Sequence, residues 1–278
     1  MNIIRSSFLK FAGGISALAA AGAAGLLHTA AALAAWNKAG FESKALADTL
    51  KNLGVSNPTE SRDITITAPD IAENGAVVPV AVTSRIPDTE QISIVAEKNP
   101  FPLAATFDIG NGSEGYVSTR IKMGQTSDVW AVVKAGGKFF TAKKEVKITV
   151  GGCRWGGPVA EGESAIMSEP MRIRATLQGD TADVRVLMLH PMETGQRRDG
   201  KGQIVPLHFI QSVLITHNGR TVLDAQWSQA VSRNPFLGVR IKGAKVGDKI
   251  SVTWTDNKGD KRTDEATVAG ASGPAVGR

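Results

Sequence analysis

The stretch Val213-Leu214-Ile215-Thr216-His217-Asn218-Gly219-Arg220-Thr221-Val222-Leu223 decides the fold class of this chain. Asn218-Gly219 lies between two short apolar runs. This dipeptide is typical of a two-residue type I′ turn, because both of its residues tolerate positive φ. The stretch therefore predicts two antiparallel strands joined by a tight turn.

Similar β-rich segments, each bounded by turn residues, continue on both sides of this hairpin. The turn Asp256-Asn257-Lys258-Gly259 predicts a second hairpin, between 250–254 and a segment that ends at Val268. Further strands are predicted at 63–67, 77–82, 92–96, 116–123, 129–133, 146–150, 172–177, 184–189 and 208–216.

A helix is predicted ahead of these strands, at 36–53, because Leu46, Leu50 and Leu53 recur at helical spacing and Gly54 supplies a stop. The predicted fold is mainly β, with two immunoglobulin-like β-sandwich domains, the first carrying the N-terminal helix. We expect the two sandwiches to pack against each other, with a linker crossing their surface.

Composition indicates a folded chain and gives little support for nucleic-acid binding. The 278 residues are 42% hydrophobic and 21% charged, which is enough to build a sizeable core. The formal net charge is +6, but the basic residues are scattered among acidic ones and do not cluster with aromatic residues. We therefore expect no nucleic-acid partner.

The N-terminus has the pattern of an export signal over 1–35. Arg5 and Lys10 form a short basic region, 11–35 carry no formal charge, and Ala32-Leu33-Ala34 is a small-x-small cleavage site. The mature protein is then expected in the periplasm, without a membrane segment, and the alternative is an uncleaved anchor. The route of export stays open, because Ser6 stands where a twin-arginine signal has its second arginine.

The single cysteine, Cys153, is flanked by Gly151-Gly152 and by Gly156-Gly157. Paired glycines disfavour helix and strand, so the sequence predicts a flexible linker at 151–170 that exposes the thiol. A lone cysteine cannot form an internal disulfide. In an oxidising compartment it is expected to join another molecule, to form a disulfide-linked homodimer, or to be presented to other proteins. An incidental linker cysteine is the alternative.

Catalysis by the chain itself is the competing class of function. A cysteine enzyme needs a positioned base, and the candidates after the signal are His190, His208 and His217, whose spacing does not converge on the thiol. Met188 and Met192 near His190 could form a soft copper site, but packing is favoured for both methionines. The sequence thus predicts no catalytic residue, no metal and no cofactor.

Longer motifs carry a resemblance to a known family. The first half has Asp70-Ile71-Ala72-Glu73-Asn74-Gly75-Ala76-Val77-Val78-Pro79-Val80 and Lys147-Ile148-Thr149-Val150-Gly151-Gly152-Cys153, and it resembles SoxY. The second half resembles SoxZ, through the segments 185–195, 208–211, 216–219, 234–237 and 254–260. Met167 to Arg174 looks like a former SoxZ start. The resemblance divides the chain into 1–35 (signal), 36–150 (SoxY-like), 151–170 (linker), 171–270 (SoxZ-like) and 271–278 (tail).

This resemblance implies a carrier protein of the periplasmic Sox thiosulfate-oxidation system. In that family the cysteine follows paired glycines on a flexible arm, and sulfur intermediates are attached to its thiol. The implied partners are a c-type cytochrome that conjugates thiosulfate (SoxAX), a sulfate-releasing hydrolase (SoxB) and often a sulfane dehydrogenase (SoxCD). The implied arm residues are Cys153 and the four glycines Gly151, Gly152, Gly156 and Gly157.

Two features depart from the family pattern. Arg154 and Trp155 follow the cysteine where the family has glycines, and the fusion ties both ends of the arm. An indole beside the thiol could obstruct a narrow active site or dock on a partner. The alternative function is a non-carrier periplasmic β-sandwich binding or scaffold protein, in which the cysteine is vestigial or forms an intermolecular disulfide.

Overall fold

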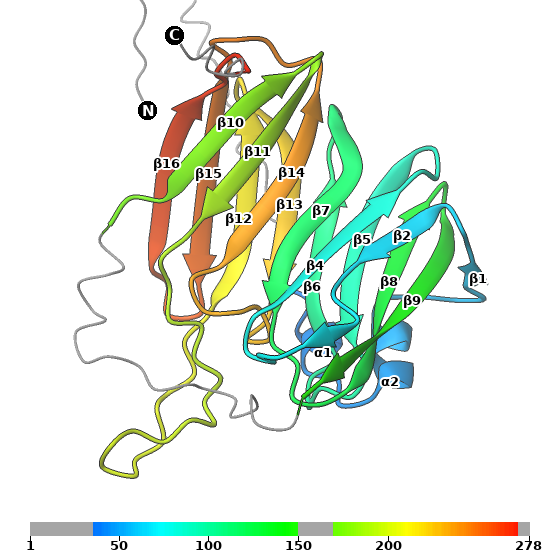
Figure 1. The fold of residues 1–278 in the computed structure, drawn as a ribbon, viewed down its shortest axis with the longest axis vertical. Coiled ribbons are helices and arrows are strands. Elements are labelled where there is room, and N and C mark those ends of the chain that lie inside the picture. The colour runs from blue at the N-terminus through cyan, green and yellow to red at the C-terminus, as the bar shows by residue number, and fades with distance from the viewer. Residues whose placement is uncertain (1–35, 150–168, 272–278) are drawn as a thin grey trace, which may run out of the picture. The chain divides into compact units, whose positions relative to one another are not determined.

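A computed structural model describes residues 36–149 and 169–271, which belong to one compact unit. Two β-sheets face each other in this unit, and two short helices lie beside one end of it (Figure 1). The mainly β fold of immunoglobulin-like sandwiches with an N-terminal helical segment is confirmed. No helix in the described ranges is long and apolar enough to cross a membrane.

The N-terminal helical segment consists of two helices, α1 (Lys38–Phe41) and α2 (Leu46–Asn52), so the single helix predicted at 36–53 is wrong. Ala45, the residue before α2, is extended, with a ψ of 151°. Phe41 and Leu46 are five residues apart and would point about 140° away from each other on one straight helix. The break lets both pack into the same small cluster with Val95 and Leu103.

The larger sheet has the strand order β1-β9-β8-β5-β6-β13-β12-β15-β16, and β3 also pairs with β9. Its strands are β1 (Thr59–Glu60), β3 (Ile71–Ala72), β5 (Thr89–Ala96), β6 (Leu103–Ile109), β8 (Ser127–Ala135), β9 (Lys138–Ile148), β12 (Ile210–His217), β13 (Arg220–Trp227), β15 (Lys249–Asp256) and β16 (Lys261–Thr267).

The smaller sheet has the order β10-β11-β14-β7-β4-β2. Its strands are β2 (Ile64–Thr67), β4 (Val78–Ser84), β7 (Ser113–Ile121), β10 (Arg172–Gln178), β11 (Thr181–Leu187) and β14 (Phe236–Lys242). Apolar side chains from both sheets form one core, which contains residues from both halves of the chain.

The two halves of the chain meet edge to edge in both sheets. In the larger sheet β6 of the first half pairs with β13 of the second half, and in the smaller sheet β7 pairs with β14. These pairings satisfy the backbone donors and acceptors that an edge strand otherwise leaves open. The two sandwiches therefore share their sheets as well as their core.

Both predicted hairpins are confirmed. Asn218 and Gly219 have φ angles of 49° and 81° between β12 and β13, as a type I′ turn requires, and Gly259 has a φ of 90° between β15 and β16.

Four strands were not predicted: the two-residue strands β1 and β3, and the longer strands β6 and β14. The first five residues of β6 are all buried, so this strand has no alternation of apolar and polar residues. In β14, Gly238 interrupts the apolar run, and a Cβ there would come within 3.3 Å of the Ser118 side chain on β7.

Candidate functional site

The predicted thiol and the glycines around it, Cys153, Gly151, Gly152, Gly156 and Gly157, lie outside the described residues, as do Arg154 and Trp155. The structure instead describes the two points where the main fold holds this segment. These are the end of β9 on one side and the beginning of β10 on the other.

The end of β9 is held by the motif at 70–80 that carries the family resemblance. Its β3 part pairs with β9 in parallel, with Ile71 opposite Lys147 and Ala72 opposite Ile148. The backbone N–H of Lys147 donates to the Asp70 carbonyl at 2.9 Å, and that of Thr149 donates to the Ala72 carbonyl at 3.3 Å. The chain is thus fixed up to four residues before Cys153.

The other side of the segment is fixed at Met171, immediately before β10. The Met171 N–H donates to Oδ2 of Asp264 on β16 at 2.9 Å, and its side chain is buried. The segment that contains the thiol is therefore anchored in the sheets on both of its sides.

Each of the three histidines in the described ranges is bonded to a carboxylate. His217, next to the hairpin turn, pairs with Asp248 at 2.7 Å. Hydrogen bonds from Asn218 and His217 lower the pKa of Asp248 to about 2. The remaining two, His190 and His208, share Asp256, and their spacing along the chain did not indicate this convergence.

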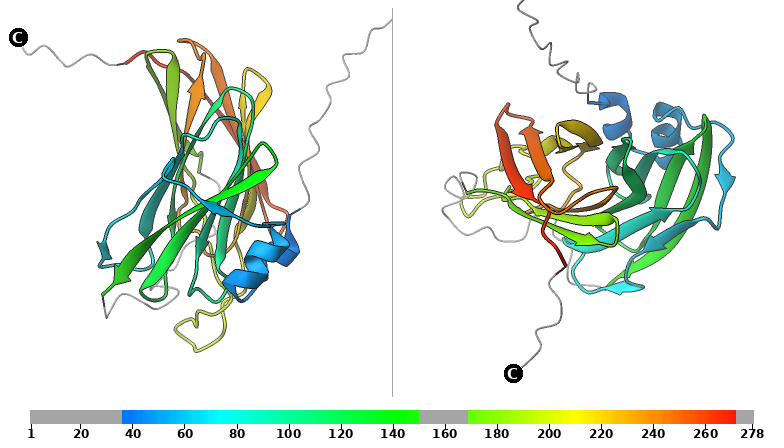
Figure 2. Two further views of the ribbon diagram at one scale, coloured as in Figure 1. Left: turned by 90° about the vertical axis from the view of Figure 1, so that its right-hand side faces the viewer. Right: turned by 90° about the horizontal axis from the view of Figure 1, so that it is seen from above.

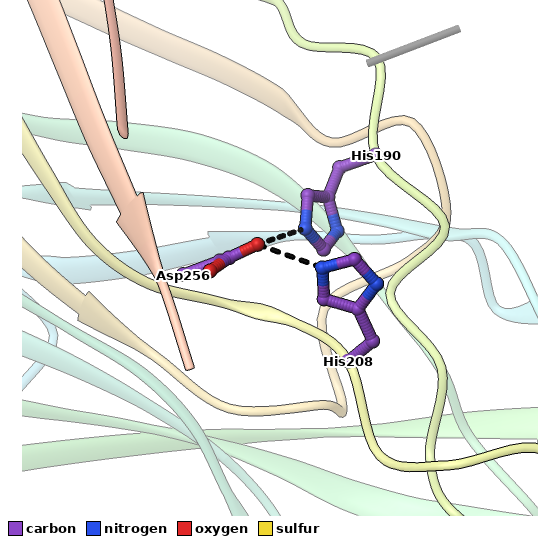
Figure 3. Close-up of side chains that lie close together, drawn as sticks. All are labelled: His190, His208 and Asp256. Carbon is purple, nitrogen blue, oxygen red and sulfur yellow. Dashed lines mark hydrogen bonds and ion pairs between the residues drawn. The ribbon is translucent and has the colours of Figure 1, made fainter. Parts of the chain in front are cut away.

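In this second cluster both imidazoles point at one carboxylate oxygen (Figure 3). His190 Nε2 lies 3.3 Å and His208 Nε2 lies 2.7 Å from Oδ2 of Asp256, whose side chain is fully buried. The other oxygen, Oδ1, accepts from the backbone N–H groups of Lys258 and Asp260 at 2.8 and 2.9 Å. Asp256 therefore connects the end of β15 with the segment that joins β11 to β12.

The hydrogen bonds fix the tautomer of His190. Its Nδ1 accepts from the backbone N–H of Met192 at 3.1 Å, so the proton of the neutral ring is on Nε2, which donates to Asp256. Burial lowers the pKa of His190 to about 4, which keeps this ring neutral at neutral pH.

Two imidazoles and a carboxylate within 4.8 Å of one another are also a donor set for a transition metal. The arrangement does not fit one. A metal on Nε2 of neutral His190 would place the ring proton on Nδ1, opposite the N–H of Met192. The 2.7 Å between His208 and Asp256 is also a hydrogen-bond distance, shorter than the roughly 3.3 Å between ligands about 2.0 Å from a tetrahedral ion. The cluster is a hydrogen-bond network. Met192, considered as a soft ligand, has its sulfur 3.3 Å from the Ile210 N–H.

A buried lysine that the sequence did not reveal lies where the halves meet. The Lys122 ammonium, just after β7, donates to the carbonyls of Met192, Gln229 and Val231 in the second half, at 2.7 to 2.9 Å. Burial lowers the pKa of Lys122 to about 7, and the charge of Glu193 acts in the opposite direction. Lys122 follows an ordinary strand pattern, so only the packed structure shows its partners.

Comparison with known families accounts for both halves. The family described as "Sulfur oxidation protein SoxY" matches residues 50–153, and the family described as "Sulphur oxidation protein SoxZ" matches residues 171–267. The chain belongs to the SoxY and SoxZ families. We refer to the described residues 36–149 as the SoxY half and to the described residues 169–271 as the SoxZ half.

Solved structures include a relative of the SoxY half. "Structure of the sulfur carrier protein SoxY from Chlorobium limicola f thiosulfatophilum" is 42% identical, covers 36% of this chain and 92% of that chain, and has a TM-score of 0.34. A superoxide reductase (neelaredoxin) from Ignicoccus hospitalis is 18% identical over 32% of this chain and 81% of its own, with a TM-score of 0.29. No curated protein matched the sequence.

Proposed function

We propose that this chain carries sulfur intermediates of thiosulfate oxidation as covalent adducts on Cys153. Membership of the SoxY and SoxZ families gives it a role in sulfur oxidation. The observation that supports the finer proposal is that the SoxY match ends on Cys153 itself, four residues beyond the last described residue of the SoxY half. The pairing of β9 with β3 gives the segment before that thiol a fixed starting point.

The chemistry of loading is an oxidation. Cys153 loses its thiol proton, and its sulfur forms a bond to the terminal sulfur of thiosulfate, which yields a cysteine S-thiosulfonate. Two electrons and one proton are released, and a c-type cytochrome partner accepts the electrons. Hydrolysis of the outer sulfur–sulfur bond then adds water, releases sulfate and leaves a persulfide on Cys153.

The role assigned to this chain is presentation, and the proposed partners do the chemistry. The partners are the thiosulfate-conjugating cytochrome, the sulfate-releasing hydrolase and a sulfane dehydrogenase where the pathway has one. Support comes from the described histidines, which are each bonded to a carboxylate and have side chains at most 11% exposed. The proposal includes export to the periplasm, which rests on the pattern of residues 1–35.

Mass spectrometry of the mature protein tests this function. The protein is incubated with thiosulfate, the partner cytochrome and an electron acceptor, and the Cys153 peptide is then analysed with and without a reductant. We expect an adduct of the mass of thiosulfate that the reductant removes, and none in Cys153→Ser. Free thiol or homodimer alone after this treatment would refute the carrier function.

His217→Asn serves as a matched control for catalysis by the chain itself. We expect this variant to load thiosulfate as the wild type does, because His217 bonds to Asp248 beside the turn between β12 and β13. Loss of loading in a folded His217→Asn protein would instead favour a cysteine enzyme in which this histidine is the base.

A further inference from the structure

The segment between β11 and β12 contains a hairpin that leaves the two sheets, here called the 193–208 hairpin. Its strands meet at two isolated bridges, Glu193 with His208 and Arg198 with Ile204. Two backbone bonds close the turn at its tip: the Asp199 N–H donates to the Gln203 carbonyl at 2.8 Å, and the Gly202 N–H donates to the Asp199 carbonyl at 3.0 Å. The hairpin is therefore an ordered element.

Polar contacts hold the hairpin together and fix its base to the main fold. Arg197 donates to Glu193 through two nitrogens, at 2.6 and 3.0 Å, and the Glu193 side chain is 7% exposed. His208 is held by Asp256, and Asn257 Nδ2 donates to the Leu207 carbonyl at 3.1 Å. The network around Asp256 thus holds a projecting hairpin in one position.

The tip carries exposed side chains that the fold itself does not use. Ile204 is 58% exposed and Leu207 is 40% exposed. The exposed cations Arg198 and Lys201 form no ion pair within the described residues. Because Arg197 is paired with Glu193, the charges at the tip are those of Arg198 and Lys201 against Asp199, which sum to +1. Apolar side chains among such cations are typical of a protein-binding surface.

The position of the hairpin relates it to the thiol-bearing segment. Two views that differ by a turn about the vertical axis both place the hairpin and the last residues of β9 at the same end of the unit (Figures 1 and 2). Most of the large apolar side chains that are exposed in the described ranges lie at this end of the unit. Ile71 lies on β3 and Val77 lies directly before β4, whereas Ile204 and Leu207 lie on the hairpin. Val246 is the exception, because it lies in the turn after β14. That turn is at the opposite end in both views.

We propose that the 193–208 hairpin docks the carrier onto an acidic, partly apolar surface of the partner enzyme while that enzyme acts on Cys153. This inference rests on the proposed carrier function. The chain on both sides of the thiol-bearing segment is anchored in the sheets, so the thiol reaches an active site only if the body of the carrier comes to rest beside the entrance. The hairpin supplies this contact: its cations increase the association rate and its apolar side chains are buried in the complex.

The test uses the double variant Lys201→Glu with Ile204→Ser in the full mature chain. Arg198 is left unchanged because its guanidinium donates to the Gly202 carbonyl at 2.7 Å and so holds the turn. Lys245→Glu with Val246→Ser is the matched control, because it changes the same kinds of exposed side chain at the opposite end of the unit. Both variants are compared with the wild type for thiosulfate loading by the purified partner cytochrome.

We expect the hairpin variant to raise KM for the carrier about tenfold with kcat unchanged, which corresponds to roughly 1.4 kcal/mol of lost binding. The control variant should keep the wild-type KM. Raising the ionic strength should increase KM of the wild type more than KM of the hairpin variant, because screening weakens the contact that Lys201 makes.

Direct binding separates failure of the docking inference from failure of the carrier function. The affinity of Cys153→Ser protein for the cytochrome is measured with and without the hairpin changes, which requires no loading. Equal affinities or equal KM values for hairpin variant and wild type would overturn the docking inference, even if Cys153 is loaded normally. Binding that weakens only in the hairpin variant would support it, even if no adduct forms.

Discussion

Asp256→Asn is the most informative substitution outside the thiol-bearing segment. It preserves the shape of the side chain but replaces one acceptor oxygen by an NH₂ donor. In the wild type, Oδ2 of Asp256 accepts from His190 and His208, and Oδ1 accepts from two backbone N–H groups. The single oxygen of an asparagine can accept from one of these two pairs of donors, and its NH₂ group then faces the other pair of donors.

The magnitude follows from the tautomers of the two rings. His208 can move its proton to Nδ1 and accept from the new amide with Nε2. His190 cannot do so, because its Nδ1 already accepts from the Met192 N–H. The substitution therefore leaves the buried Nε2–H of His190 without an acceptor, at a cost of about 1–3 kcal/mol. The two backbone bonds also lose their charged acceptor, which adds about 1 kcal/mol.

We expect the free energy of unfolding to fall by about 3 kcal/mol, and the melting temperature to fall by about 6–12 °C for a domain of this size. Urea denaturation followed by circular dichroism measures the first quantity, and a thermal scan measures the second. Asp260→Asn is the matched control, because Asp260 lies in the same turn with an exposed side chain. A loss below about 1 kcal/mol for Asp256→Asn would show that His190 can change its tautomer, and would refute the hydrogen-bond assignment.

Three further predictions concern pH, the contact between the halves and the thiol. The pKa of His190 is lowered from 6.5 to about 4, so the folded state binds fewer protons than the unfolded state between these pH values. The free energy of unfolding should therefore fall by about 3 kcal/mol as the pH drops through this window. The same dependence of the unfolding free energy on pH in His190→Gln would contradict this prediction. Lys122→Met leaves three buried carbonyls without a donor, and calorimetry should show a loss of about 3 kcal/mol; a variant as stable as the wild type would contradict it. Arg154 is the one charged residue adjacent to Cys153 in the sequence, so we expect a thiol of nearly ordinary reactivity. Iodoacetamide should alkylate Cys153 at a rate within about threefold of the rate for glutathione at the same pH, and a rate tens of times higher would show an activated thiol.

Local patterns in the sequence predicted the β class because their physical cause is local. Asn218-Gly219 favours positive φ whatever surrounds it, and the flanking apolar runs fit the half-buried faces of two paired strands. The motifs at 70–80 and around Cys153 were recognised for the same reason, since each is continuous in the chain.

Where packing overrides a local pattern, the prediction was wrong or incomplete. The helix predicted at 36–53 breaks so that Phe41 and Leu46 can reach one cluster. Strand β6 has no alternation because both of its faces are covered. Each of these outcomes depends on neighbours that are far away in the sequence.

The sequence alone determined the β-rich fold class, the two halves with their family resemblance, and the single thiol next to paired glycines. Each of these features depends on residues that follow one another in the chain. Only the tertiary structure decided that the halves share both sheets, that Lys122 of one half donates to three carbonyls of the other, and that Asp256 holds His190, His208 and the 193–208 hairpin. These contacts join residues tens of positions apart, and the burial that gives them their strength exists only after the sheets have formed.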